Sequence, residues 1–264
     1  MCTSSCHVIK RGLAVAGFLV LTSCGGGVGT SGPCALMSCG GPPSNITVFA
    51  AASLQPAFDK IAVRVKSQYY LATTFNYAGT QTLTTQLIQG AQADVFASAD
   101  TAHMTTVQNG GLVGGDTRVF AHNKLEIAVE RGNPKRIRSL ADLARSGLVV
   151  VLADPSVPAG KYAQEALAKA HVTVHPASLE PQVTGVLSKV AFGEADAGIV
   201  YVSDIVTSGK VDGIAIPDIQ NVIADYSIAR LNSAWNRAGA DEFFAYVLSS
   251  QGQAILSGAG FDTV

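Results

Sequence analysis

The sequence predicts an α/β protein with mainly parallel sheets. Short apolar, β-branched runs alternate along the chain with stretches in which apolar residues recur at helical spacing. One run, residues 149–153, is fully apolar, which is typical of a parallel strand covered on both faces. With 264 residues, 48% of them hydrophobic, the chain is long enough for one large domain or two lobes of ordinary size.

The first strand–helix unit organises the rest of the chain. Residues 46–49 predict a buried strand, and three alanines and Ser53 follow it. The apolar positions then change to helical spacing, as Leu54, Ala57, Phe58, Ile61, Ala62 and Val65. Ser53 therefore stands where a strand ends and a helix begins. It could cap that helix, or it could help to bind an anion there, and the stretch alone leaves both roles open.

Further strands and helices alternate in the same way. Strands are expected at residues 73–78, 94–97, 124–130, 149–153, 197–201 and 226–231. Helices are expected near residues 83–88, 104–109, 140–144, 162–170, 183–191 and 243–248. Gly90, the pair 110–111 and Gly193 end three of these helices.

The N-terminus predicts an export signal. Lys10 and Arg11 precede an apolar run over residues 12–23, which is too short to span a bilayer. The run ends in Leu-Thr-Ser-Cys at residues 21–24, followed by three glycines, and it resembles the lipobox of bacterial lipoproteins. We therefore expect a signal peptide over residues 1–23, lipidation of Cys24 and a flexible tether over residues 24–44. An ordinary signal peptide with a stray cysteine is the alternative.

Cysteine positions and net charge exclude several classes of function. All five cysteines lie within the first 39 residues, so the globular part has no cysteine for catalysis or metal binding. Cys34 and Cys39 could form a small disulfide loop in an exported chain. A net charge of −1 gives no electrostatic footprint for nucleic acid.

Candidate binding groups recur at the carboxyl ends of the expected strands, where parallel-sheet proteins bind their ligands. They are Ser53, Thr80, the Pro-Ala-Gly turn at residues 158–160 and Tyr201. Lysine, arginine, histidine and paired carboxylates are scarce at these positions. Such a set would hold an anion through neutral donors.

Enzymatic motifs are weak. The sequence Gly160-Lys161 is followed by Tyr162 and so does not complete a phosphate-binding loop, and no Gly-x-Ser-x-Gly elbow occurs. A hydrolase using Ser53 is conceivable, but His103, His122, His171 and His175 show no special setting, and surface positions are expected for them. His171 and His175 have the spacing of helical metal ligands, yet Pro176 argues against a helix there. We expect no catalytic residue, no cofactor and no direct protein ligand to a metal.

Five segments in order carry a family resemblance. They are ITVFAAASL (46–54), AGTQTLTTQLIQ (78–89), GAQADVFASAD (90–100), DPSVPAGKYAQEAL (154–167) and GIVYVSD (198–204). Together they resemble ModA, the molybdate-binding protein family of ABC importers, over essentially all of residues 45–261. Each motif alone is modest, and the order and spacing of the five make the resemblance specific.

The resemblance implies a type II periplasmic-binding-protein fold, with two α/β lobes, a mainly parallel sheet in each, and a two-strand hinge. Lobe 1 would hold residues 45–122 plus 225–264, and lobe 2 residues 123–224. The family's ligand-binding positions fall on two hydroxyls, two backbone amides and a phenol. In this chain these are Ser53, Thr80, Ala159, Val183 and Tyr201. Thr80 stands where serine is common, and the interval from Ala159 to Val183 is slightly short.

The function that the resemblance implies is transport. The chain would be a lipoprotein on the outer side of the cytoplasmic membrane, a monomer that captures molybdate, and tungstate, between its lobes and delivers it to an ABC permease. Donors without acceptors would disfavour a protonated oxyanion such as phosphate at neutral pH, whereas sulfate would have to be rejected by size. A receptor for sulfate or phosphate is the first alternative, and a serine hydrolase using Ser53 is a distant one.

Overall fold

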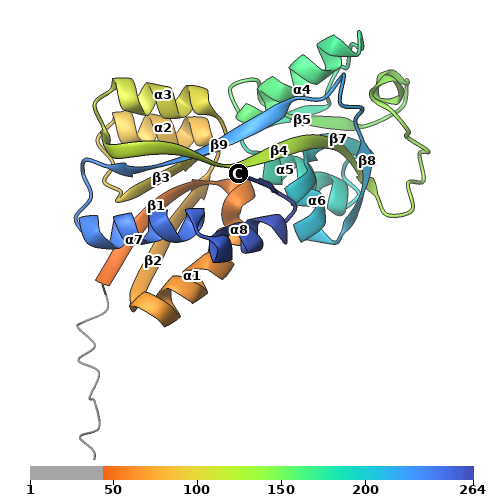
Figure 1. The fold of residues 1–264 in the computed structure, drawn as a ribbon. Helices are drawn as coiled ribbons and strands as arrows, with labels where there is room; N and C mark the ends of the chain where they lie inside the picture. The colour runs from red at the N-terminus through yellow and green to blue at the C-terminus, as the bar shows by residue number, and fades with distance from the viewer. Residues whose placement is uncertain (1–43) are drawn as a thin grey trace, which may run out of the picture. The chain divides into compact units, whose positions relative to one another are not determined.

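The computed structural model describes residues 44–264 (Figure 1). The predicted signal peptide, the lipidation site Cys24, the Cys34–Cys39 pair and the tether up to residue 43 lie outside the described residues. Ser44, the last residue of the expected tether, already belongs to the first strand. Within residues 44–264, no helix has the length and apolar character needed to cross a membrane.

Three parallel strands lie at one end of the sheet, in the first half of the molecule. β1 (Ser44–Ala51) lies between β2 (Leu71–Ala78) and β3 (Val95–Ser98). The helices α1 (Gln55–Tyr69), α2 (Thr80–Ile88) and α3 (Thr101–Asn109) follow these strands. The apolar stripe expected in α1 is buried at Ala57, Phe58, Ile61 and Val65. Phe58 lies at the centre of an aromatic cluster with Phe75, Phe120 and Phe243.

A second group of parallel strands lies in the other half. β5 (Val150–Ala153) pairs with β6 (Ser178–Glu180) on one side and β7 (Ala197–Tyr201) on the other. The 3₁₀ helix η2 (Leu140–Ala144) precedes β5. α4 (Pro158–Lys169), α5 (Val183–Ala191) and α6 (Val202–Ser208) follow β5, β6 and β7 in turn. β8 (Val211–Ala215) completes this half by pairing antiparallel with β4 (Val113–Glu130).

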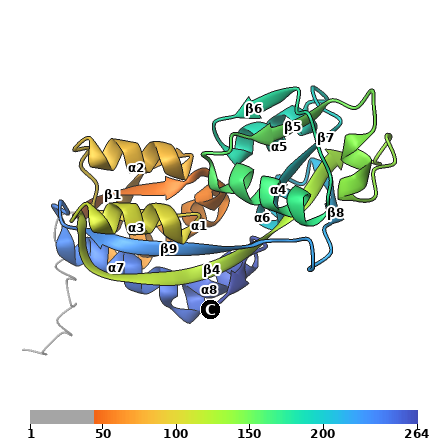
Figure 2. The ribbon, with the colours of Figure 1, turned by 90° about the horizontal axis from the view of Figure 1, so that it is seen from above.

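Two long antiparallel strands run between the halves. β4 pairs with β9 (Ile223–Leu231) near the first half and with β7 and β8 in the second. Figure 2 shows β4 and β9 side by side from one half to the other. The expected strand at residues 124–130 covers only the end of β4, so that prediction was wrong for residues 113–123. The strand pattern is interrupted at Gly114, Gly115 and Asp116, where the pairing of β4 with β9 also shifts register.

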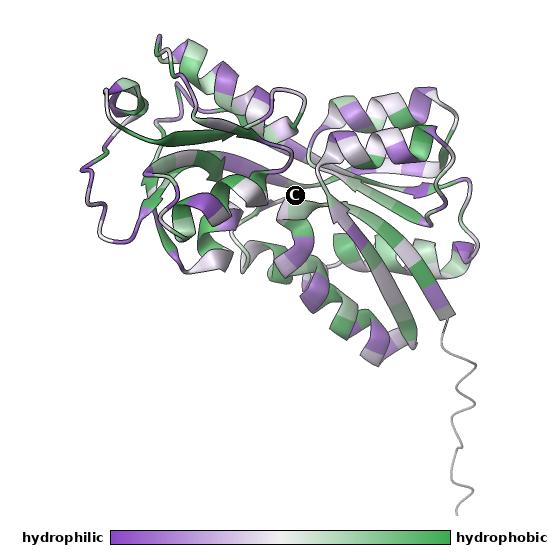
Figure 3. Cartoon of the chain, turned by 180° about the vertical axis from the view of Figure 1, so that it is seen from behind, coloured by the Kyte–Doolittle hydropathy of each residue, from purple (hydrophilic) through white to green (hydrophobic). Residues whose placement is uncertain are grey.

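The C-terminal segment returns to the first half. α7 (Arg237–Leu248) and α8 (Ser250–Ser257) precede the short strand β10 (Asp262–Thr263), which pairs with β4. Figure 3 shows mostly hydrophobic residues along the strands, whereas hydrophilic residues are frequent on the helices and loops. The predicted α/β class with mainly parallel pairing around β1 and β5 is confirmed. The lobe boundaries at residues 122–123 and 224–225 stay a prediction.

Candidate functional site

The five residues expected to bind a ligand lie around one cavity. Ser53, Thr80, Ala159, Val183 and Tyr201 all line it, although the chain separates the first from the last by almost 150 residues. The cavity encloses about 230 Å³ of free space, counting its opening to solvent. Its other lining residues are alanines, valine, proline, glycine and one glutamine, so no charged side chain of residues 44–264 lines it.

Ser53 is held by a tyrosine and not by its helix. It lies in the 3₁₀ turn η1 (Ala52–Leu54) between β1 and α1 and is 3% exposed. Its Oγ is 2.9 Å from the Oη of Tyr226, and no side chain caps η1 or α1. Of the two roles left open for Ser53, helix capping is therefore the wrong one. Pro56 in the first turn of α1 lacks an N–H group, which reduces the need for a cap.

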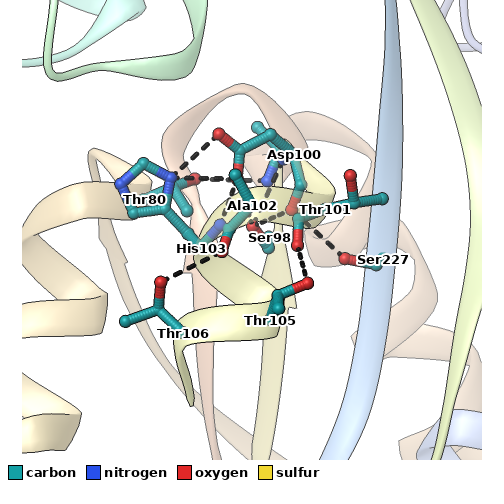
Figure 4. Close-up of polar contacts among 10 residues, drawn as sticks. Thr80, Ser98, Asp100, Thr101, Ala102, His103, Thr105, Thr106 and Ser227 are labelled. Atoms are coloured by element: carbon teal, nitrogen blue, oxygen red, sulfur yellow. Dashed lines mark hydrogen bonds and ion pairs between the residues drawn. The ribbon is translucent and has the colours of Figure 1, made fainter. Parts of the chain in front are cut away.

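Thr80 opens α2, and its hydroxyl oxygen already accepts a hydrogen bond. The backbone N–H of Ala99, at the end of β3, donates to Thr80 Oγ1 at 3.2 Å (Figure 4). The next residues of this loop are fixed as well. The Ser98 hydroxyl donates to the Asp100 carbonyl at 2.6 Å, and the Asp100 carboxylate caps α3 by accepting from the His103 N–H at 2.9 Å. The Thr80 proton is left for a partner on the cavity side.

Two helices begin at the cavity, and the backbone N–H groups of their first turns are candidate donors to a ligand. Ala159 is the second residue of α4, and Val183 is the first residue of α5. First-turn N–H groups have no partner within their own helix, and no side chain caps either helix. Gly160 lets α4 begin close against the preceding turn, because a Cβ at this position would lie 2.1 Å from the Asp154 carbonyl oxygen.

Tyr201 presents a hydroxyl without a partner. The residue ends β7 and is 1% exposed, and its buried Oη makes no hydrogen bond. Burial raises the pKa of the Tyr201 phenol well above its ordinary value, so the group remains a neutral donor. Buried hydroxyls nearly always have a hydrogen-bond partner, and an unsatisfied one is costly. At this position in the cavity wall the hydroxyl can donate to a bound ligand.

The two halves meet beside the cavity. The Gln81 side chain on α2 donates to the Pro181 carbonyl, just before α5, at 2.9 Å. Gly79 approaches the same carbonyl so closely that a Cβ would lie 2.5 Å from it. The glycine at residue 79 is therefore what lets the start of α2 face the start of α5 across the cavity.

Two histidines pair with carboxylates, but no histidine in the described part of the chain lines the cavity. His103 Nδ1 lies 2.9 Å from the buried Asp100 carboxylate, and His122 Nδ1 lies 2.7 Å from Asp225. Both side chains are partly exposed, at 24% and 37%, which agrees with the expected surface positions, and only the carboxylate partners were not expected. Because the partner of Ser53 is a tyrosine and not a histidine, the site lacks the base that a serine hydrolase requires. In the described part of the chain, no cluster of three or more His, Cys, Asp or Glu residues could hold a metal ion.

The sequence did not predict the role of two residues that contact the site from behind. Tyr226 on β9 contacts Ser53, and Asp204 in α6 accepts the Tyr201 N–H at 3.0 Å. Burial raises the pKa of Asp204 to about 7, and the hydrogen bond from Tyr201 opposes that shift. Asp204 lies within the segment GIVYVSD used for the resemblance, but nothing in its spacing indicated a buried carboxylate.

Comparison with known proteins identifies the family. Residues 46–262 match the family of bacterial extracellular solute-binding proteins. The chain belongs to this family. The molybdate-binding protein ModA of Mycobacterium tuberculosis is 45% identical to this solute-binding protein over 219 residues, which cover 82% of the chain and 84% of ModA. The expected resemblance to ModA is thereby confirmed, and a solute-binding family agrees with the prediction that the chain is not an enzyme.

Solved structures confirm the fold. The periplasmic molybdate-binding protein of Azotobacter vinelandii has a TM-score of 0.74 at 20% identity, covering 83% of this chain and 99% of that one. The sulfate-binding protein SubI of Mycobacterium tuberculosis has a TM-score of 0.76 at 18% identity, covering 84% and 87%. At such identities the likeness shows the periplasmic-binding-protein fold and does not decide which ion is bound.

Proposed function

We propose that this solute-binding protein captures molybdate, and tungstate, in the cavity and delivers it to the permease of an ABC importer. The observation that carries the proposal is the buried, unpartnered hydroxyl of Tyr201 in a wall that also contains Ser53, Thr80 and the starts of α4 and α5. The 45% identity to a molybdate-binding protein supports the choice of ion.

Neutral donors are sufficient to hold such a ligand. A tetrahedral dianion removed from water must have its oxygens satisfied by hydrogen bonds. A bond to an ionised acceptor contributes about 1.5–3 kcal/mol, and three hydroxyls and two amides could provide five such bonds. The N-termini of α4 and α5 add favourable partial charges. High affinity therefore does not require an arginine or lysine in the wall.

We further propose that the chain is exported and anchored by a lipid on Cys24, with residues 24–44 as the tether and a single copy as the working unit. The match to a family of bacterial extracellular solute-binding proteins supports the export of this chain. Expression of the full chain in a bacterial host tests the anchor. Cys24→Ala should move the protein from the membrane to the soluble fraction, and Cys6→Ala should not.

Calorimetric titration tests the ligand. The mature protein should bind molybdate and tungstate tightly with one site, and sulfate and phosphate at least about 100-fold more weakly, which corresponds to roughly 2.7 kcal/mol. Comparable binding of all four ions would contradict the proposal, and a preference for sulfate would favour the alternative receptor.

A double variant tests the site. Ser53→Ala combined with Thr80→Ala should abolish molybdate binding, because it removes two donors from a buried anion. Thr105→Ala provides the matched control, since its hydroxyl bonds the Thr101 carbonyl on the exposed face of α3. Unchanged affinity in a folded double variant would refute the site.

A further inference from the structure

Tyr226 touches two of the proposed ligand-binding residues from outside the cavity. It lies on β9, is fully buried and does not line the cavity wall. Its Oη is 2.9 Å from Ser53 Oγ. Its ring packs edge-on against that of Tyr201, with the centroids 5.8 Å apart, and against Phe261 at 5.2 Å. One side chain on a strand that runs between the halves therefore supports a donor from each half.

The chemistry of an anion fixes the direction of the Tyr226–Ser53 hydrogen bond. A serine hydroxyl has one proton to donate and two lone pairs that accept. A fully ionised oxyanion only accepts, so Ser53 has to give it that proton. Tyr226 must then be the donor to Ser53 Oγ. Burial raises the pKa of Tyr226 above its ordinary value, and the phenol therefore keeps the proton that it donates.

Thr80 is arranged in the same way. Its Oγ1 accepts the Ala99 N–H, so its own proton is also left for the cavity. Ser53 and Thr80 thus each have a protein donor on the hydroxyl oxygen. The donor to Thr80 is a backbone N–H, which truncating a side chain does not remove, whereas the donor to Ser53 is a side chain. Tyr226 is consequently the position at which this arrangement can be tested.

We propose that Tyr226 is a positioning residue that fixes the Ser53 hydroxyl as a donor toward the cavity and thereby biases the site against oxyanions that carry a proton. This inference rests on the proposed function, since it needs an oxyanion in the cavity. Without the Tyr226 hydroxyl, Ser53 could rotate and accept a hydrogen bond from the O–H of hydrogen phosphate. Loss of Tyr226 should therefore change selectivity as well as affinity.

The test uses the mature protein and the isosteric change Tyr226→Phe. Molybdate affinity should fall roughly 5- to 30-fold, as expected for one hydrogen bond. The affinity for hydrogen phosphate relative to that for molybdate, measured by competition at neutral pH, should rise by about the same factor. Tyr246→Phe is the matched control, because its buried phenol bonds Gln251 in the C-terminal segment, away from the cavity. It should leave both affinities unchanged.

A double-mutant cycle separates positioning from a general structural effect. In a Ser53→Ala background, Tyr226→Phe should weaken molybdate binding by less than about twofold, because the group that it positions is gone. An equal loss with and without Ser53 would overturn the proposal. The proposal would also be overturned if Tyr226→Phe kept full molybdate affinity, or if its affinity for phosphate relative to molybdate did not rise.

Two further results complete the test. If the wild-type protein binds neither molybdate nor tungstate, the proposed function fails, which is distinct from a failure of Tyr226 alone. A crystal structure of the wild-type complex does not depend on any variant folding. Ser53 Oγ within hydrogen-bond distance of both Tyr226 Oη and a molybdate oxygen would support the proposal, and a Ser53 side chain turned away from Tyr226 would overturn it.

Discussion

Replacing Tyr201 by phenylalanine should affect binding and stability in different ways. In the ligand-free protein the Oη is buried and makes no hydrogen bond, so removing it breaks no hydrogen bond within the protein. The ring keeps its edge-on packing against Tyr226. The free energy of unfolding without ligand should therefore stay the same or rise, since a buried unsatisfied group costs about 1–3 kcal/mol.

The same substitution should weaken molybdate binding. If the hydroxyl donates to the dianion, its loss removes a hydrogen bond to a charged acceptor, worth about 1.5–3 kcal/mol, or roughly a ten- to hundredfold rise in Kd. Tyr226→Phe provides the contrast, because it breaks the existing bond to Ser53 and should lower the ligand-free stability by about 0.5–1.5 kcal/mol.

Two measurements on the same samples decide the matter: urea unfolding without ligand and calorimetric titration with molybdate. The reasoning fails if Tyr201→Phe lowers the ligand-free stability as much as Tyr226→Phe does. It also fails if molybdate affinity is unchanged in Tyr201→Phe.

Two further predictions concern the framework of the site. Gly160→Ala should destabilise the protein by about 1–3 kcal/mol in urea unfolding, because the new Cβ would meet the Asp154 carbonyl, whereas Gly115→Ala meets only the flexible end of Arg230 and should be nearly neutral. For Asp204, burial raises the folded pKa from its ordinary value of 3.8 to about 7, so the folded state binds more protons than the unfolded state between these values. Stability should therefore fall as pH rises from about 4 to about 7 and level off above, and Asp204→Asn should remove that part of the slope; equal slopes in the two proteins would contradict the assignment.

The sequence predicted those elements whose own residues carry a regular pattern. β7 and the buried face of α1 coincide with the expected ranges because apolar spacing alone defines them. The first half of β4 was not predicted, because its Gly-Gly-Asp stretch has no strand pattern. Only pairing with β9 makes this segment a strand. Local composition does not encode a partner that lies about 100 residues further along the chain.

In the site, too, the sequence predicted what depends on local pattern and not what depends on distant partners. Ser53, Thr80 and Tyr201 could be found because each follows or ends an expected strand, and parallel strands bring such ends together. The role of Ser53 could not be found in this way. Its partner Tyr226 is 173 residues away in the sequence. A tyrosine within a strand pattern predicts only a buried core residue. Capping was one of two roles that the local sequence allowed, and the structure shows a long-range hydrogen bond to Tyr226 in its place.

The distribution of donors links binding to the contact between the halves. Ser53 and Thr80 come from the first half, and Ala159, Val183 and Tyr201 come from the second. A dianion held by either set alone would leave oxygens without donors, which is costly away from water. The proposed ligand therefore has a higher affinity for the state in which the halves meet, and it shifts the population toward that state. The Gln81 bond to the Pro181 carbonyl adds stability to the same state whether or not an ion is present. The measured Kd should accordingly depend on the population of this closed state as well as on the donors.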